Sequence, residues 1–262
     1  MSILVKFWHK TLNRPHRLHI HYDKGTGKAV ILLHGLASSS AIWQPLFNQL
    51  PNRSDLRIVA VDLLGFGKSP KPDYSQYDIA AHAESVAYTL RRLNINSAVV
   101  VGHSMGCLVA THLAVISPKL VDKLILYEPP LFADDPAYRS HARRRDMYTA
   151  LFQALLNRPQ LVFAYSRVLR NSLNRLAGAT LTQQTWLPFD RSLRNTIMKQ
   201  SAYRELRAIT IPTDIIHGRF DIMVTRLETQ QMFKHNDCIK LHLINQKHDV
   251  TPSAARYILK LI

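Results

Sequence analysis

Short apolar runs rich in β-branched residues alternate with helix-like segments along most of this chain. Continuous runs of this kind are typical of strands buried on both faces of a parallel sheet, with helices as the crossovers. The pattern predicts an α/β fold with a mostly parallel, doubly wound sheet and helices on both faces. The expected strands are residues 17–23, 29–33, 56–62, 97–102, 121–128, 211–218 and 239–245. The expected helices are residues 41–50, 78–94, 105–117, 225–235 and 252–262.

The alternation stops between residues 129 and 207. No strand-like run appears there, and helix-like stretches are interrupted near Pro136, Pro159, Gly178 and Pro188. We therefore expect an all-helical insertion at 129–207 between two parts of one α/β core, residues 1–128 and 208–262. The length of 262 residues suits a single domain that carries such an insertion.

Positive charge is concentrated in the same region. The formal net charge is +16, and residues 131–210 contain 13 Lys and Arg against five Asp and Glu. A basic surface of this kind would favour anionic substrates or anionic surfaces. The alternative is a solvated, Arg-rich helical face, and no nucleic-acid recognition motif accompanies the charge.

The sequence also bears on cellular location. No apolar run reaches the roughly 18 residues of a membrane-spanning helix. The N-terminal residues lack the long apolar core and the small-residue cleavage site of a signal peptide. Two cysteines, Cys107 and Cys238, are too few for a disulfide framework. These features predict a cytoplasmic protein without a transmembrane segment.

The motif GHSMG, residues 102–106, carries the clearest chemical signal. It matches G-x-S-x-G, and it lies between an expected strand and an expected helix, as a nucleophile elbow requires. Such a turn holds the serine in a strained conformation, and glycines on either side let strand and helix approach closely. The helix N-terminus offers free N–H groups to a developing oxyanion. The motif predicts Ser104 as a nucleophile.

A nucleophilic serine needs a base and an orienting carboxylate, both at the sheet edge where strands end. Among the 13 histidines, His248 follows the last expected strand by three residues, and His34 and His217 also end strands. Asp221 follows the strand at 211–218 and is the preferred acid. The rival acids are Asp62, whose position suits a turn-stabilising role, and Glu128.

Taken together, the motifs resemble those of the α/β-hydrolase superfamily, in particular its capped serine esterases. LLHG, DLLGFGKS, GHSMG, HGRFD and KHD occur in the family's order over essentially the whole chain. The resemblance implies a catalytic triad of Ser104, Asp221 and His248, with an oxyanion hole formed by the backbone N–H groups of Leu36 and Met105. It further implies that residues 129–207 form a helical cap, and that no metal or cofactor is needed.

By this resemblance the expected function is a carboxylesterase-like hydrolase of small-molecule esters. A lactonase, or a C–C bond hydrolase of ring-fission products, would use the same triad, although His103 before the nucleophile favours esters. A receptor that keeps the hydrolase fold is the alternative from another class. Trp186 and Phe189 could line the substrate pocket or fill the core of the cap. One departure is Lys247, which stands where the family usually has glycine before the histidine.

Overall fold

The structure is a computed structural model. It describes residues 7–12, 14–50, 55–132, 182–199, 202–221 and 233–262, together with parts of 146–160. Residues 225–232 of the expected helix at 225–235 and the interruptions at Pro136, Pro159 and Gly178 lie outside these residues, and residues 233–235, the end of that expected helix, form a turn.

Strands and helices alternate in the described residues much as the apolar pattern predicts. The strands are β1 (Ile20–Lys24), β2 (Lys28–Leu33), β3 (Leu56–Val61), β4 (Ala98–His103), β5 (Val121–Tyr127), β6 (Thr213–Gly218) and β7 (Ile239–Ile244). The α-helices are α2 (Gln44–Phe47), α3 (Ile79–Arg92), α4 (Met105–Ile116), α8 (Gln183–Ser192), α9 (Ala202–Arg207) and α11 (Pro252–Leu261). Shorter helical turns are η1 (Phe7–Thr11), η2 (Ser40–Trp43), η3 (Pro118–Leu120) and η5 (Leu193–Ile197).

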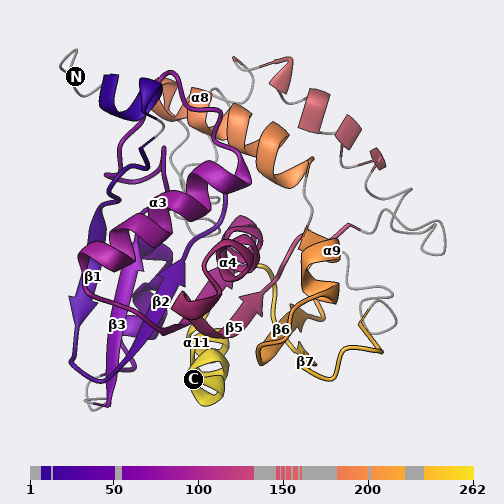
Figure 1. The fold of residues 1–262 in the computed structure, drawn as a ribbon. Helices are drawn as coiled ribbons and strands as arrows, with labels where there is room; N and C mark the ends of the chain where they lie inside the picture. The colour runs from indigo at the N-terminus through magenta and orange to yellow at the C-terminus, as the bar shows by residue number, and fades with distance from the viewer. Residues whose placement is uncertain are drawn as a thin grey trace.

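The strands form one seven-stranded sheet in the order β1-β3-β2-β4-β5-β6-β7. Only β1 runs antiparallel to its neighbour, and the other pairs are parallel. The strand order reverses direction between β2 and β4, which are hydrogen-bonded neighbours; Figure 1 shows β1, β3 and β2 on one side of the sheet and β5, β6 and β7 on the other. In open α/β sheets, ligands bind at such a switch point, beyond the carboxyl ends of the strands.

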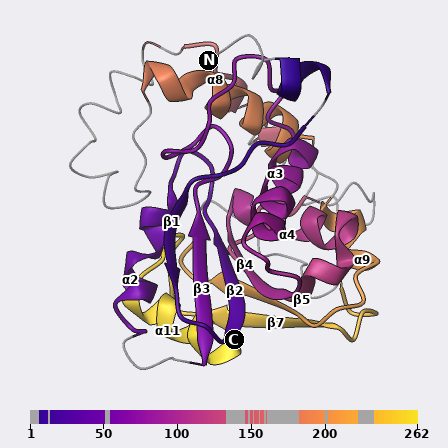
Figure 2. The same cartoon turned by 60° about the vertical axis from the view of Figure 1, so that its left-hand side comes forward.

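Two apolar layers enclose the sheet. On one face α3 and α4 pack over residues such as Ile31 and Val100, and on the other α2 and α11 pack over residues such as Val30 and Val99 (Figure 2). Successive residues of a strand point to opposite faces, so each buried strand supplies both layers. The prediction of a mostly parallel, doubly wound sheet is confirmed.

The region expected to form a helical insertion contributes α8, η5 and α9 to the described residues. The interruption expected near Pro188 is wrong, because α8 runs through this residue. Pro188 is buried, and a Cβ on Gly65 would lie 2.5 Å from its Cβ. Pro188 therefore packs against the loop that follows β3, and this tertiary contact is made by a proline inside the helix. The boundaries of the insertion stay a prediction.

Across the described residues, no helix combines the length and the apolar character that crossing a bilayer requires.

Buried histidines make the fold sensitive to acid. Burial lowers the pKa of His82 and of His103 from 6.5 to about 3, and it lowers the pKa of His16 to about 4. Between these values and 6.5 the unfolded chain binds more protons than the folded chain, so stability falls as the pH falls.

We therefore predict that the melting temperature at pH 5 is well below that at pH 7. His82 and His103 would each contribute about 2 kcal/mol to this loss. His82→Gln should show a smaller pH-dependent loss, because glutamine does not titrate and can keep the bond to Ser192 (3.0 Å). Thermal unfolding of both proteins across this pH range is the measurement. Equal losses in both would contradict the assignment.

Candidate active site

Ser104 lies on the turn between β4 and α4. Its backbone dihedrals, φ 52° and ψ −121°, are ones that residues other than glycine rarely adopt. Its N–H donates to the Tyr127 carbonyl at 3.0 Å, which ties the turn to the end of β5. Ser104 is half-buried, whereas both neighbours are buried. The turn therefore brings one hydroxyl to the edge of an otherwise closed part of the fold.

Glycines allow β2, β4 and α4 to meet at this turn. A Cβ on Gly106 would lie 2.4 Å from the carbonyl oxygen of Leu33, and one on Gly102 would lie 2.6 Å from the backbone of α4. A Cβ on Gly35 would lie 3.1 Å from the Cβ of Ser104. The segment after β2 is thus packed directly beside the serine, at the switch point of the sheet.

Two backbone N–H groups at this place make no hydrogen bond within the described residues. One belongs to Leu36, which follows Gly35, and the other to Met105, the first residue of α4. The first N–H groups of a helix have no partner inside it, and they carry the positive end of the helix dipole. Both groups are therefore free to donate to an anionic oxygen next to Ser104.

Asp221 and His248 come from the loops that follow β6 and β7, and they meet in a hydrogen bond. His248 Nδ1 donates to Asp221 Oδ2 at 2.7 Å. The Asp221 side chain is 2% exposed and that of His248 is 24% exposed. Because Nδ1 carries the proton in this bond, Nε2 is left to accept one.

His103, the residue before Ser104, lies next to His248 and so relates the histidine to the serine. The ring centroids of His103 and His248 lie 4.9 Å apart. No hydrogen bond joins Ser104 Oγ to His248 in the described part of the chain. In enzymes without bound substrate such bonds are often long, and they tighten when the substrate binds.

The rival acid Asp62 has a different set of partners. Its carboxylate accepts from the Ser40 N–H and hydroxyl (both 2.8 Å), from the Lys68 N–H (2.8 Å) and from His19 Nδ1 (3.0 Å). Burial by itself would raise the pKa of Asp62, but the hydrogen bonds from Lys68 and Ser40 outweigh it and lower the pKa. Asp62 thus joins two loops as an anion, and His248 is not among its hydrogen-bond partners in the described residues.

The other rival, Glu128, is fully buried at the end of β5, with φ 54°. Its Oε1 accepts from the Gly218 N–H at 2.5 Å, and its Oε2 lies 3.6 Å from His217 Nδ1. Glu128 therefore anchors the start of the loop that carries Asp221. The other strand-end histidine, His34, is also occupied: its Nδ1 donates to Gly35 O at 2.7 Å, and its Nε2 accepts from the Leu63 N–H at 2.8 Å.

Trp186 and Phe189, expected at the substrate pocket or in the core of the cap, lie on α8. Their ring centroids are 5.6 Å apart, and both side chains are half-buried against the main apolar core. A role in the pocket stays a prediction.

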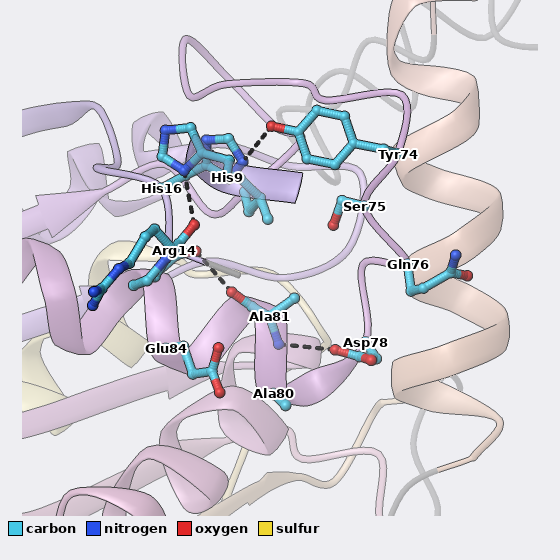
Figure 3. Close-up of a pocket in the computed structure, with 13 residues that line it drawn as sticks. His9, Arg14, His16, Tyr74, Ser75, Gln76, Asp78, Ala80, Ala81 and Glu84 are labelled. Carbon is cyan, nitrogen blue, oxygen red and sulfur yellow. Dashed lines mark hydrogen bonds between the residues drawn. The ribbon is translucent and has the colours of Figure 1, made fainter. Parts of the chain in front are cut away.

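A cavity of about 260 Å³ lies elsewhere, between the N-terminal segment, the loop before α3 and the start of α3 (Figure 3). The His9 ring stacks on His16 with centroids 3.8 Å apart, and His16 Nε2 is hydrogen-bonded to the Tyr74 hydroxyl at 3.2 Å. No member of the predicted triad lines it. The cavity is therefore distinct from the candidate active site.

Two contacts were not predicted from the sequence, because they depend on which strand ends become neighbours in the sheet. The Tyr127 hydroxyl and the His103 ring both contact the backbone around His248. The only sequence signal for them is that each residue ends an apolar run.

Comparison with known proteins places this geometry in a family. The model of the alpha/beta hydrolase fold family matches residues 28–251. AB hydrolase superfamily protein YisY of Bacillus subtilis (strain 168) is 31% identical over 211 residues, which are 76% of this chain and 76% of that protein. A solved esterase from Exiguobacterium antarcticum superposes with a TM-score of 0.74 at 21% identity, covering 93% of each chain.

A plant relative is more similar over a shorter stretch. The probable lysophospholipase BODYGUARD 3 of Arabidopsis thaliana is 38% identical over 132 residues, or 48% of this chain. The match spans only 26% of that protein, about a quarter of its length. The family match, by contrast, extends over most of the chain. This chain belongs to the alpha/beta hydrolase fold family.

Proposed function

We propose that this protein is a serine hydrolase that cleaves carboxylic esters of small molecules. The observation that carries the proposal is a pair of N–H groups, on Leu36 and Met105, that have no hydrogen-bond partner among the described residues and lie beside a serine held on a strained turn. An acyl-transfer site needs such donors where negative charge develops, and each is worth about 3–4 kcal/mol of transition-state stabilisation. The bond between Asp221 and His248 supplies the base with its orienting acid.

The first half of the proposed reaction forms an acyl-enzyme. Ser104 Oγ attacks the ester carbonyl carbon while its proton passes to His248 Nε2. The carbonyl oxygen becomes an oxyanion, which accepts from the N–H groups of Leu36 and Met105. When the intermediate collapses, the C–O bond to the alcohol breaks, and the alcohol leaves with the proton from Nε2. Asp221 holds the imidazole in orientation and stabilises its charged form.

Water completes the cycle. It attacks the acyl carbon as His248 Nε2 takes one of its protons, and the same two N–H groups bind the second oxyanion. The acid product then leaves as its bond to Ser104 Oγ breaks, and the serine regains its proton from Nε2. The name of the plant relative, a probable lysophospholipase, supports an ester as the bond that is cleaved.

Ser104→Ala should lower kcat for a short-chain p-nitrophenyl ester by at least about 10⁴-fold, because it removes the hydroxyl that forms the acyl-enzyme. It should also abolish labelling by a fluorophosphonate. Ser97→Ala is the matched control: Ser97 lies just before β4, at the opposite end of the strand, and its side chain contacts exposed Asp122. Turnover by Ser104→Ala that equals the control would exclude Ser104 as the nucleophile.

Replacing either acid separates its role in catalysis from its role in folding. Asp221→Asn should lower kcat by roughly 10³–10⁴-fold with little loss of thermal stability, because the amide favours the wrong imidazole tautomer. Asp62→Asn should lower the melting temperature, since it removes an anion with four donors, and leave kcat per folded molecule within about tenfold. The reverse pattern would make Asp62 the acid.

The basic region supports a preference for anionic esters. Arg158, Arg204 and Arg207 are exposed in its described part. The kcat/KM for a p-nitrophenyl ester of a dicarboxylic acid should fall several-fold between about 0.05 and 0.3 M salt, because salt screens attraction between exposed charges. The value for a neutral ester of similar length should stay nearly constant. Equal salt responses would support a solvated basic face without a role in substrate binding.

A further inference from the structure

We infer that His103 and Tyr127 are positioning residues that clamp the backbone on both sides of His248. The inference rests on the proposed function, in that His248 is taken as the base, and it adds two residues that hold this base in place. Both lie at strand ends, outside the triad and outside the oxyanion hole.

The clamp consists of two donors that face three consecutive carbonyl groups. His103 Nε2 donates to the carbonyl of His248 at 2.8 Å. The Tyr127 hydroxyl lies 2.9 Å from the carbonyl of Lys247 and 2.9 Å from that of Asp249, and it can donate to either. Every carbonyl from 247 to 249 thus faces a donor from the end of β4 or β5.

The sheet register places the two donors together. His103 and Tyr127 are cross-strand partners in the parallel pair β4–β5, and their ring centroids lie 5.6 Å apart. Both residues are buried, and buried strands of a central sheet are among the most stable parts of a fold. Because β4 also delivers Ser104, the clamp fixes the loop of the base to the strand of the nucleophile.

The chemical state of His103 suits this role. A bond to a carbonyl requires the proton on Nε2, and burial keeps the ring neutral, with a pKa of about 3. Its Nδ1 has no hydrogen-bond partner among the described residues and faces Gly35, where a Cβ would lie 3.2 Å away. His103 therefore acts as a fixed donor and does not compete with His248 as a base.

The loop itself gives a reason for such a clamp. Lys247, exposed before His248, stands where the resemblance leads us to expect glycine. The His248 side chain has one hydrogen bond in the described residues, the one from Nδ1 to Asp221. A single bond leaves a ring free to pivot, whereas anchored carbonyls on both sides fix the Cα from which it projects. Small displacements of a catalytic group cost large factors in rate.

Conservative variants test the clamp. Tyr127→Phe removes one hydroxyl and keeps the ring. His103→Leu removes the second donor, and His103→Gln restores an N–H that can reach the same carbonyl. Tyr257→Phe is the matched control, because it removes a hydroxyl bonded to His242 Nδ1 at 2.9 Å, remote from the triad. For each variant, kcat and KM for a short p-nitrophenyl ester are measured per active site, counted by fluorophosphonate titration.

A clamp predicts a loss in kcat with little change in KM. Tyr127→Phe and His103→Leu should lose 10-fold or more in kcat per active site, with KM within about twofold of the wild type. His103→Gln should recover most of the loss, and Tyr257→Phe should match the wild type. A purely structural role would lower the number of active sites and leave kcat per site unchanged. That result, or a His103→Gln no better than His103→Leu, would overturn the inference.

Hydrogen exchange separates this inference from the proposed function. In Tyr127→Phe, the amides of residues 246–251 should exchange at least 10-fold faster than in the wild type, while those of α4 stay unchanged. An unchanged rate in 246–251 would overturn the clamp whatever the activity. A wild type without esterase activity and without fluorophosphonate labelling would defeat the proposed function alone, and the exchange result would then still decide whether the loop is clamped.

Discussion

The close approach of β2, β4 and α4 at the switch point of the sheet is the constraint on which the candidate site depends. Gly102 and Gly106 permit it, since a side chain at either position would overlap backbone atoms. The turn that results puts Ser104 at a strained φ, and the first N–H of α4 has no partner in the part of the chain that the structure describes. Strain in the backbone and a free donor are thus two consequences of one packing requirement.

The strand ends around this turn carry the supporting structure. Glu128 holds the start of the Asp221 loop through the Gly218 N–H, and Tyr127 and His103 contact the loop of His248. The two loops are also joined directly, because the Phe220 N–H donates to the carbonyl of Gln246 at 3.0 Å. Buried groups on the central strands therefore set the position of side chains that come from exposed loops.

Periodicity and turn chemistry were enough to predict the α/β class, the parallel sheet and most element boundaries. Continuous apolar runs identify strands buried on both faces, and GHSMG between a strand and a helix identifies the sharp turn. The pattern failed at Pro188, because a local rule about proline does not include the tertiary contact with the loop at Gly65. It also could not decide whether Trp186 and Phe189 line a pocket, since a half-buried aromatic side chain suits either place.

The sequence by itself determined which residues end each strand, and hence that Ser104, Asp221 and His248 are candidates for one edge of the sheet. Only the tertiary structure decided which hydrogen-bond partners each of the three candidate acids has. Asp62 accepts from backbone donors, Glu128 accepts from Gly218, and Asp221 is bonded to His248. The reason is physical: hydrogen-bond partners depend on strand order and register, and a linear pattern of apolar and polar residues does not contain that information.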